Sequence, residues 1–319
     1  MAVSLAESAK LSTNQLVRGV METFLTDTES VVLDQIQFED VTGNAWAYNE
    51  EATLPGVAFR DVNEAYTEST GTLNTKTETL KIFGGDADVD RFIEQTRGNL
   101  ASQRATQTAL KIKALRLGFQ TAFINGDSAV NPKSFDGLKK RLVGSQVIDA
   151  ATNGLPVFTA ANPASSAQDF FDALDALIAA VPGGANALYM NAATKARIKS
   201  AARRLNAWDQ QRTEFGKSID TYNGVALLDM GNDASGNPIL PQTETQGTAN
   251  DASSIYAVRW SSGEGDVGVL GLWNGGLMVD DLGMLQSMPV YRTRIELYGS
   301  IAVLGKGAAR LRGVRVAAS

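Results

Sequence analysis

The side chains that could do chemistry in this 319-residue chain are mainly carboxylates, because the sequence contains no His and no Cys. The absence of both residue types excludes Ser-His-Asp and Cys-His catalysis, Cys/His zinc sites, haem or iron–sulfur ligation and disulfides. Paired carboxylates remain as candidates for glycoside hydrolysis or Ca²⁺ binding. The acidic residues that lie close together in sequence are Asp86, Asp88 and Asp90; Glu264 and Asp266; and Asp280 and Asp281. None has calcium-loop spacing, and such neighbours are typical of turns and helix starts.

Phosphate and nucleic-acid chemistry is also poorly supported. The segment Gly271–Gly276 lacks both a Walker lysine and a GxGxxG context. The 29 Lys and Arg against 35 Asp and Glu give a formal net charge of −6, with a sequence pI near 4.9. Dedicated nucleic-acid binders are instead usually basic. We therefore expect no cofactor, no metal and no enzymatic activity.

Composition and length predict a globular protein of about two domains, and the sequence shows no targeting signal. The chain is 44% hydrophobic and 20% charged. Residues Met1–Lys10 lack the basic and apolar regions of a signal peptide, and no run of about 18 apolar residues occurs. We expect synthesis in a cytoplasm and no contact with a membrane.

Two segments near the start of the chain are too slender to form their own core. Residues Ser4–Ile36 carry a narrow apolar stripe that includes Leu16, Val20 and Phe24, which predicts a helical arm. Residues Val41–Phe83 predict a strand, a long loop and a Thr-rich returning strand. An isolated two-stranded ribbon is marginal in water. Both segments therefore predict contact with another surface.

A long helix is predicted over Asp88–Asn125, opened by acidic residues that suit the positive end of the helix dipole. Beyond it, the pattern predicts helices over Asp169–Ala180 and Ala192–Leu205. The predicted strands are Ala187–Met190, Val225–Asp229, Ile255–Trp260, Gly268–Leu272, Leu277–Val279 and Pro289–Val303. The polar segment Gly231–Ser254 is interpreted as a long loop, of a length typical of mobile or functional loops.

This order of elements resembles the major capsid proteins of tailed bacteriophages, the Hong Kong 97 fold family. The residues that carry the resemblance are Phe92-Ile93, Phe123-Ile124-Asn125-Gly126-Asp127, Ser134-Phe135-Asp136-Gly137-Leu138 and Leu188-Tyr189-Met190-Asn191. The resemblance covers nearly the whole chain and implies an α+β fold. It implies an N-terminal arm (1–40), an extended loop (41–85), a peripheral domain with a spine helix (86–167), an axial domain (168–281) and returning peripheral strands (282–319).

The family resemblance implies a structural head protein that self-assembles into pentamers and hexamers. These would form an icosahedral shell around double-stranded DNA, in a virion assembled in the host cytoplasm. Portal, scaffolding and decoration proteins are possible partners. The start of the extended loop at about residue 41 leaves no room for a long fused scaffolding domain after Met1, and the absence of Lys from Glu50–Ser69 argues against a loop isopeptide. The alternatives are an encapsulin nanocompartment shell and, from another class, a carboxylate-dependent hydrolase.

Candidate contact residues follow from the same expectation. The extended-loop residues expected between subunits are Glu50, Glu51, Phe59, Arg60, Asp61, Glu64, Tyr66 and Glu68. Their acidic members could dock on Lys139, Lys140 and Arg141 of a neighbour, while Phe59 and Tyr66 supply apolar contact and charge sets register. Arg97, Arg104 and Lys111 recur every seven residues, and could line the shell lumen and contact packaged DNA weakly. For all of these charges, an ordinary solvated surface is the competing interpretation.

Overall fold

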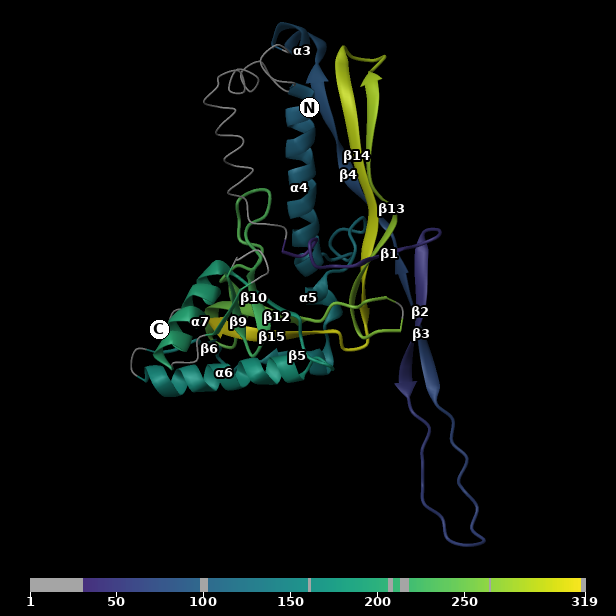
Figure 1. The fold of residues 1–319 in the computed structure, drawn as a ribbon, viewed down its shortest axis with the longest axis vertical. Coiled ribbons are helices and arrows are strands. Elements are labelled where there is room, and N and C mark those ends of the chain that lie inside the picture. The colour runs from purple at the N-terminus through teal and green to yellow at the C-terminus, as the bar shows by residue number, and fades with distance from the viewer. Residues whose placement is uncertain are drawn as a thin grey trace.

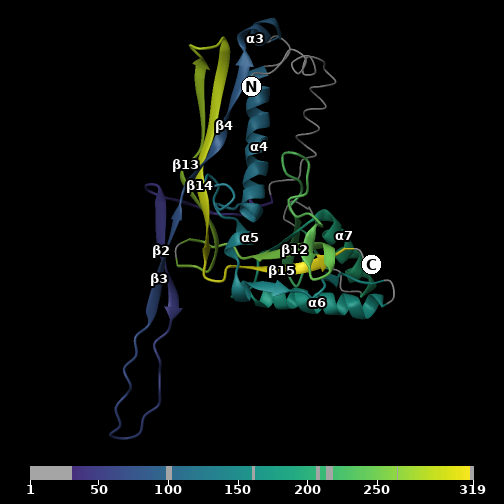
Figure 2. The same ribbon diagram turned by 180° about the vertical axis from the view of Figure 1, so that it is seen from behind.

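The computed structural model describes residues 31–97, 103–159, 162–205, 209–212, 218–263 and 265–316. The arm expected over residues 1–40 lies outside the described residues as far as residue 30. The described chain forms a long peripheral part, a more compact axial part and a hairpin that projects away from both (Figures 1 and 2). None of the described helices is long and apolar enough to cross a membrane.

The peripheral part is a four-stranded sheet with one long helix along it (Figure 1). Its strand order is β1 (Phe38–Asp40), β13 (Gly268–Met284), β14 (Val290–Leu304) and β4 (Lys81–Asp90). The helices are α3 (Arg91–Arg97) and α4 (Gln103–Asn125). Alternation in β14 buries Thr293, Ile295 and Leu297. This period of two places apolar side chains on the face that α4 covers and charged side chains on the other face.

The long helix predicted from Asp88 begins later, at Arg91, so the predicted start is wrong. Residues 81–90 form β4, and Asp86 and Asp88 pair with Arg294 and Arg292 of β14 instead of opening a helix. Of the three acidic residues, only Asp90 acts at a helix start, where its Oδ1 accepts a hydrogen bond from the Phe92 amide at 2.7 Å. Cross-strand ion pairing therefore overrides the helix-dipole signal at this position.

The axial part is a nine-stranded sheet covered on both faces. Its strands are β5 (Val147–Asp149), β6 (Leu155–Pro156), β7 (Ala187–Met190), β8 (Asp209–Arg212), β9 (Ser218–Tyr222), β10 (Val225–Asp229), β11 (Glu244–Gln246), β12 (Ala249–Val258) and β15 (Ala308–Arg315). The main order is β5-β15-β12-β7-β10-β9-β8, so β15 lies between β12 and β5. Helices α6 (Pro163–Ala179) and α7 (Ala192–Arg204) pack on one face, and the end of α4 packs on the other.

The apolar patterns predicted several of these elements closely. The strands Ala187–Met190 and Val225–Asp229 have the predicted bounds, and α6, α7 and β14 lie where helices and a strand were expected. The two strands expected at Gly268–Leu272 and Leu277–Val279 are one strand, β13, with a bulge between Trp273 and Leu277. The supposed loop Gly231–Ser254 contains β11 and the first six of the ten residues of β12.

The residue bounds expected for the separate domains remain a prediction. The limit after Asp281 falls inside β13, and β15 joins the axial sheet rather than the peripheral one.

Candidate intersubunit surface

The projecting hairpin is formed by β2 (Ala45–Thr53) and β3 (Thr72–Thr79), paired antiparallel from Ala45↔Thr79 to Thr53↔Thr72. Only its base is packed: Trp46 stacks on Tyr48, whose hydroxyl donates to the Val303 carbonyl at 3.3 Å. Seven of the eight residues of β3 are exposed. Neither face of this Thr-rich strand carries enough apolar area to close a core, so the sequence predicted that it has none of its own, and the structure confirms this.

The tip of the hairpin, residues 54–71, is exposed throughout and contains large apolar side chains. Val57 and Phe59 are fully exposed, and Val62 is 89% exposed. Single exposed apolar residues are common on protein surfaces, but several on one extended loop mark an interaction site. The tip is therefore suited to bury its side chains against another surface.

The charged residues of the tip make local contacts that shape the loop. The Arg60 guanidinium lies 5.3 Å from the centre of the Tyr66 ring and donates to the Glu64 carbonyl at 3.3 Å. The Glu64 carboxylate accepts a hydrogen bond from the Asp61 amide at 3.1 Å. In the strands, Glu50 pairs with Lys76 at 2.6 Å. Glu51 and Glu68 are exposed.

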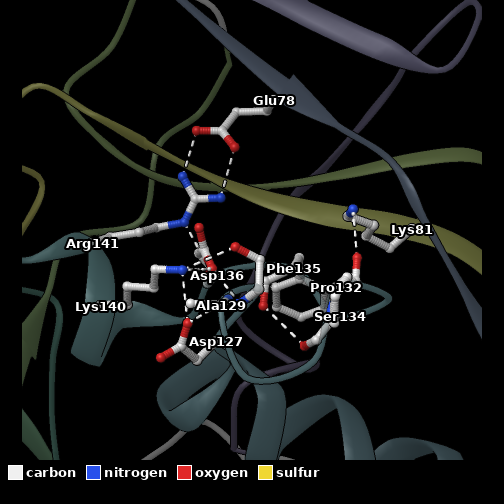
Figure 3. Close-up of polar contacts among 11 residues, drawn as sticks. Glu78, Lys81, Asp127, Ala129, Pro132, Ser134, Phe135, Asp136, Lys140 and Arg141 are labelled. Atoms are coloured by element: carbon white, nitrogen blue, oxygen red, sulfur yellow. Dashed lines mark hydrogen bonds and ion pairs between the residues drawn. The ribbon is translucent and has the colours of Figure 1, made fainter.

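The base of the hairpin is clamped to the turn that follows α4 (Figure 3). Arg141, the last residue of the short helix α5 (Leu138–Arg141), forms a two-bond ion pair with Glu78 of β3, in which Nη2 donates to Oε2 at 2.7 Å. Its Nε also donates to the Asp136 carbonyl at 2.6 Å. Lys81 Nζ donates to the Pro132 carbonyl at 3.1 Å. These contacts fix where the hairpin leaves the molecule.

The turn between α4 and α5 is held by close backbone contacts and a shared lysine. The amide of Gly137 donates to the Gly126 carbonyl at 2.8 Å, and a Cβ at either glycine would lie within 2.5 Å of a backbone oxygen. Lys140 Nζ lies 2.7 Å from Asp127 and 2.9 Å from Asp136 (Figure 3). Burial alone would raise the pKa of Asp136, but hydrogen bonds from the Ser128 amide and Lys140 lower this pKa to about 2.

These contacts change the role proposed for Lys139, Lys140 and Arg141 as receptors for a neighbour's acidic loop. Lys140 and Arg141 already pair with carboxylates of their own chain. Lys139 is half-exposed and lies 3.9 Å from Glu244, so it alone of the three retains a largely exposed charge. The sequence did not indicate the pair between Arg141 and Glu78, because 62 residues separate them and no local periodicity links them.

The candidate lumen residues do not project freely from α4. Arg104 pairs with Asp281 of β13 and lies 4.9 Å from the Tyr291 ring centre. Lys111 lies against Gly85 of β4. Both therefore face the chain's own sheet, and the side chain of Arg97 is outside the described residues. Contact of these three residues with DNA stays a prediction.

The sheet face opposite α4 carries a ladder of ion pairs between β4 and β14. Arg292 donates to both carboxylate oxygens of Asp88 at 2.7 and 2.6 Å, and Arg294 donates to both of Asp86 at 2.8 and 3.0 Å. These hydrogen bonds hold the pKa of both carboxyl groups below their usual value. The alternation of Arg292 and Arg294 in a strand was visible in the sequence, but their register against Asp88 and Asp86 was not.

The remaining carboxylate neighbours do not form a shared site. Asp281 pairs with Arg104, Asp266 pairs with Arg259, and Glu264 lies outside the described residues. Across the described ranges, no three acidic side chains gather closely enough to hold a metal ion.

The hairpin packs on the same side of the peripheral sheet as the ion-pair ladder. Trp46 and Tyr48 contact a cluster that includes Leu270, Leu272 and Ala302, whereas the intervening residues Val269 and Ile301 face the α4 side. Successive side chains of a strand point to opposite faces. The hairpin and α4 therefore lie on opposite faces of this sheet.

Comparison with known proteins agrees with this architecture. The family model of the major capsid protein GP7 matches residues 17–161. No curated protein sequence shows significant similarity to the chain.

Solved structures with a similar fold include the SrpI encapsulin from Synechococcus elongatus (TM-score 0.65, 19% identity, covering 92% of this chain and 90% of that one). The capsid of a native GTA particle is similar at TM-score 0.64 and 15% identity, with 92% of each chain covered. A chain from Mycobacterium phage Bobi is similar at TM-score 0.57 and 15% identity, with 99% of each covered. The expected Hong Kong 97-type α+β capsid fold and the resemblance to phage major capsid proteins are confirmed.

Proposed function

We propose that this chain, a shell protein with the Hong Kong 97 capsid fold, assembles into pentamers and hexamers that form an icosahedral shell around double-stranded DNA. The observation that carries the proposal is the hairpin tip, on which Val57 and Phe59 are fully exposed and Val62 is 89% exposed. The match to the major capsid protein GP7 model over residues 17–161 supports a structural role rather than an enzymatic one.

The hairpin tip packs on a neighbouring copy, on the face of its peripheral sheet that carries the ion pairs between β4 and β14. In a shell one molecule thick, all copies share the same inner and outer sides. A hairpin attached on the face away from α4 therefore meets the corresponding face of its neighbour. That face presents Ile82, Met278, Arg292, Arg294, Glu296 and Tyr298. Phe59 and Tyr66 supply apolar contact area there, and the acidic loop residues Glu51, Asp61, Glu64 and Glu68 set the register.

The basic residues on α4 make weak contacts at most with packaged DNA, because Arg104 pairs with Asp281 and Lys111 lies against Gly85 of the chain's own sheet. Portal, scaffolding and decoration proteins complete the particle, which is assembled in the host cytoplasm and retained in the virion. The single experiment that tests this function is electron microscopy of the purified protein at increasing concentration. Closed particles are expected, and a monomer at every concentration would overturn the proposal.

An encapsulin shell is the second candidate, since the SrpI encapsulin has the same fold at a TM-score of 0.65. The two candidates differ in contents. Particles recovered from the native source should carry nuclease-protected double-stranded DNA if the chain is a viral capsid protein. Particles that carry a packaged enzyme and no DNA would establish the compartment instead.

A further inference from the structure

An apolar groove runs between α4 and the peripheral sheet on the face away from the hairpin. Its volume is about 220 Å³. The apolar residues that line it include Leu33, Ile112, Leu115, Trp273, Leu277 and Leu297. Ile112 and Leu115 come from the same face of α4, and Leu277 and Leu297 are paired across β13 and β14. The groove is thus bounded by a helix, by two strands and, through Leu33, by the first described residues of the chain.

One side of this groove is unfinished. The strand β1 pairs only with Gly271–Trp273, and no described strand continues along the outer edge of β13. Leu277 is 44% exposed and Val279 is 47% exposed, although both lie on the face of the sheet that α4 covers. Half-exposed apolar side chains beside an open groove provide area for another segment to bury.

The hairpin of a neighbouring copy is a poor occupant for this groove. It is attached on the opposite face of the sheet, and in a single-layer shell it remains on that side. The occupant must therefore come from the α4 side of the molecule.

The described chain starts beside the groove. The carbonyl of Val31 accepts a hydrogen bond from the Tyr189 hydroxyl at 3.0 Å, Val32 is fully buried, and Leu33 and Asp34 line the groove. The thirty residues that precede Val31 are joined to the groove through the short segment Val31–Leu33. Such a tether gives a segment an effective concentration in the millimolar range at a nearby site.

The residues that precede Val31 include a segment whose chemistry suits an apolar groove. Residues 13–25 contain one basic and one acidic residue, Arg18 and Glu22, so their net charge is zero. Leu16, Val20 and Phe24 recur every four residues, a spacing that places them on one face of a helix.

We propose that residues 13–25 of the same copy dock in this groove and place Leu16, Val20 and Phe24 against Leu115 and Leu277. The segment then covers the apolar face of the peripheral part before any subunit meets another. The choice of occupant rests on the proposed single-layer shell, which keeps a neighbour's hairpin on the other face of the sheet. The contact itself lies within one copy, so it can be tested on unassembled protein.

Thiol crosslinking of the full-length, unassembled chain tests the contact, since the protein has no native Cys. The variant with Val20→Cys and Leu277→Cys is treated with a short bismaleimide. The matched control combines Val20→Cys with Met278→Cys, because Met278 is adjacent to Leu277 but points to the opposite face. We expect an intramolecular crosslink in the first variant at a yield at least several-fold above the control. Equal yields, or mainly intermolecular products at high dilution, would overturn the proposal.

Dye binding gives a second, independent measurement. In the full chain, Val20→Asp should expose the groove and raise bis-ANS fluorescence several-fold, with an unchanged circular dichroism melting curve. Gln15→Asp, which introduces the same charge on the side of the helix away from Leu16, Val20 and Phe24, should leave the fluorescence unchanged. The same fluorescence for both variants would contradict docking through Leu16, Val20 and Phe24.

Discussion

At the scale of single residues, the pair between Arg141 and Glu78 decides where the hairpin leaves the molecule. Their side chains are 16% and 14% exposed, so the loss of either leaves a charge that is largely removed from water. By contrast, Lys76 and Glu50 lie farther along the same hairpin with exposures of 50% and 26%. Both pairs therefore involve a residue of β3, but the pair between Arg141 and Glu78 is the more buried of the two.

Arg141→Gln should destabilise the chain by about 3 kcal/mol, because removing one partner of a buried ion pair leaves the other uncompensated. Hydrogen exchange in β2 and β3 should increase more than exchange in the axial sheet. The matched control is Lys76→Gln, for which we expect a loss of at most about 1 kcal/mol. Chemical denaturation measures both values, and an equal loss for the two variants would show that the clamp has no special role.

The ion-pair ladder predicts a dependence of stability on pH. Hydrogen bonds from Arg294 and Arg292 depress the pKa values of Asp86 and Asp88 in the folded state. Groups with a depressed folded pKa stabilise the fold above their unfolded pKa of about 3.9, and this stabilisation is lost as the pH falls through the folded pKa. Asp88→Asn should therefore flatten the fall in melting temperature between about pH 5 and pH 2. Glu51→Gln, an exposed carboxyl on the hairpin, should not.

Ion pairs between residues far apart in the sequence could not be predicted from the residues alone. The carboxylates Asp86, Asp88 and Asp90 were expected to open a helix, because local spacing carries no information about a strand more than two hundred positions away. The register Asp88↔Arg292 exists only once β4 and β14 are paired. In contrast, Phe59 and Tyr66 could be named from the sequence alone as loop residues for contact with a neighbour. Both are exposed in the single chain, and their contact with a neighbour stays a prediction.

At the scale of elements, α4 organises the peripheral part, with Phe119 and Phe123 fully buried in its last two turns. Leu115→Pro should cost about 3 kcal/mol or more, because proline removes a backbone donor and clashes with the preceding turn. Leu115→Met keeps the side-chain volume and should cost less than about 1.5 kcal/mol. Thermal unfolding compares the two variants, and similar melting temperatures would refute a continuous helix at this position.

The hairpin tip should act between molecules and not within one. Phe59→Asp places a charge on a side chain that is fully exposed in the single chain, so the free energy of unfolding should change by no more than about 0.5 kcal/mol. Assembly should nevertheless weaken, because burying an unpaired carboxylate against a neighbour is costly. Light scattering during assembly measures this effect. Val130→Asp, at another exposed apolar residue away from the hairpin, is the control and should assemble normally.

Periodicity was a reliable guide to elements that bury one face. The buried strand Ala187–Met190 and the helix after it were predicted from their apolar residues. The structure adds the helix cap, in which Asn191 Oδ1 accepts a hydrogen bond from the Thr194 amide at 2.7 Å. The single long strand β13 was missed because Asn274, Gly275 and Gly276 resemble a turn. Gly275 and Gly276 both have φ near +73°, and they form a bulge that the strand continues past.

At the scale of the whole molecule, stability and assembly should be separable. Replacing residues 54–71 by a short Gly-Ser turn removes only exposed residues, so the melting temperature should stay within a few degrees of the parent value. Closed particles should be absent from electron micrographs at concentrations where the parent chain forms them. Global unfolding in the circular dichroism spectrum of the deletion variant would show that the loop supports its own core after all.

The place of β15 in the axial sheet has a consequence for biosynthesis. Residues 308–315 lie between β12 and a strand made of residues 147–149, so the sheet has a gap until the ribosome has passed residue 315. A nascent or prematurely terminated polypeptide lacks this internal strand and exposes the unpaired edges of β12 and β5. Such products would be recognised by chaperones and proteases before they could poison a growing particle.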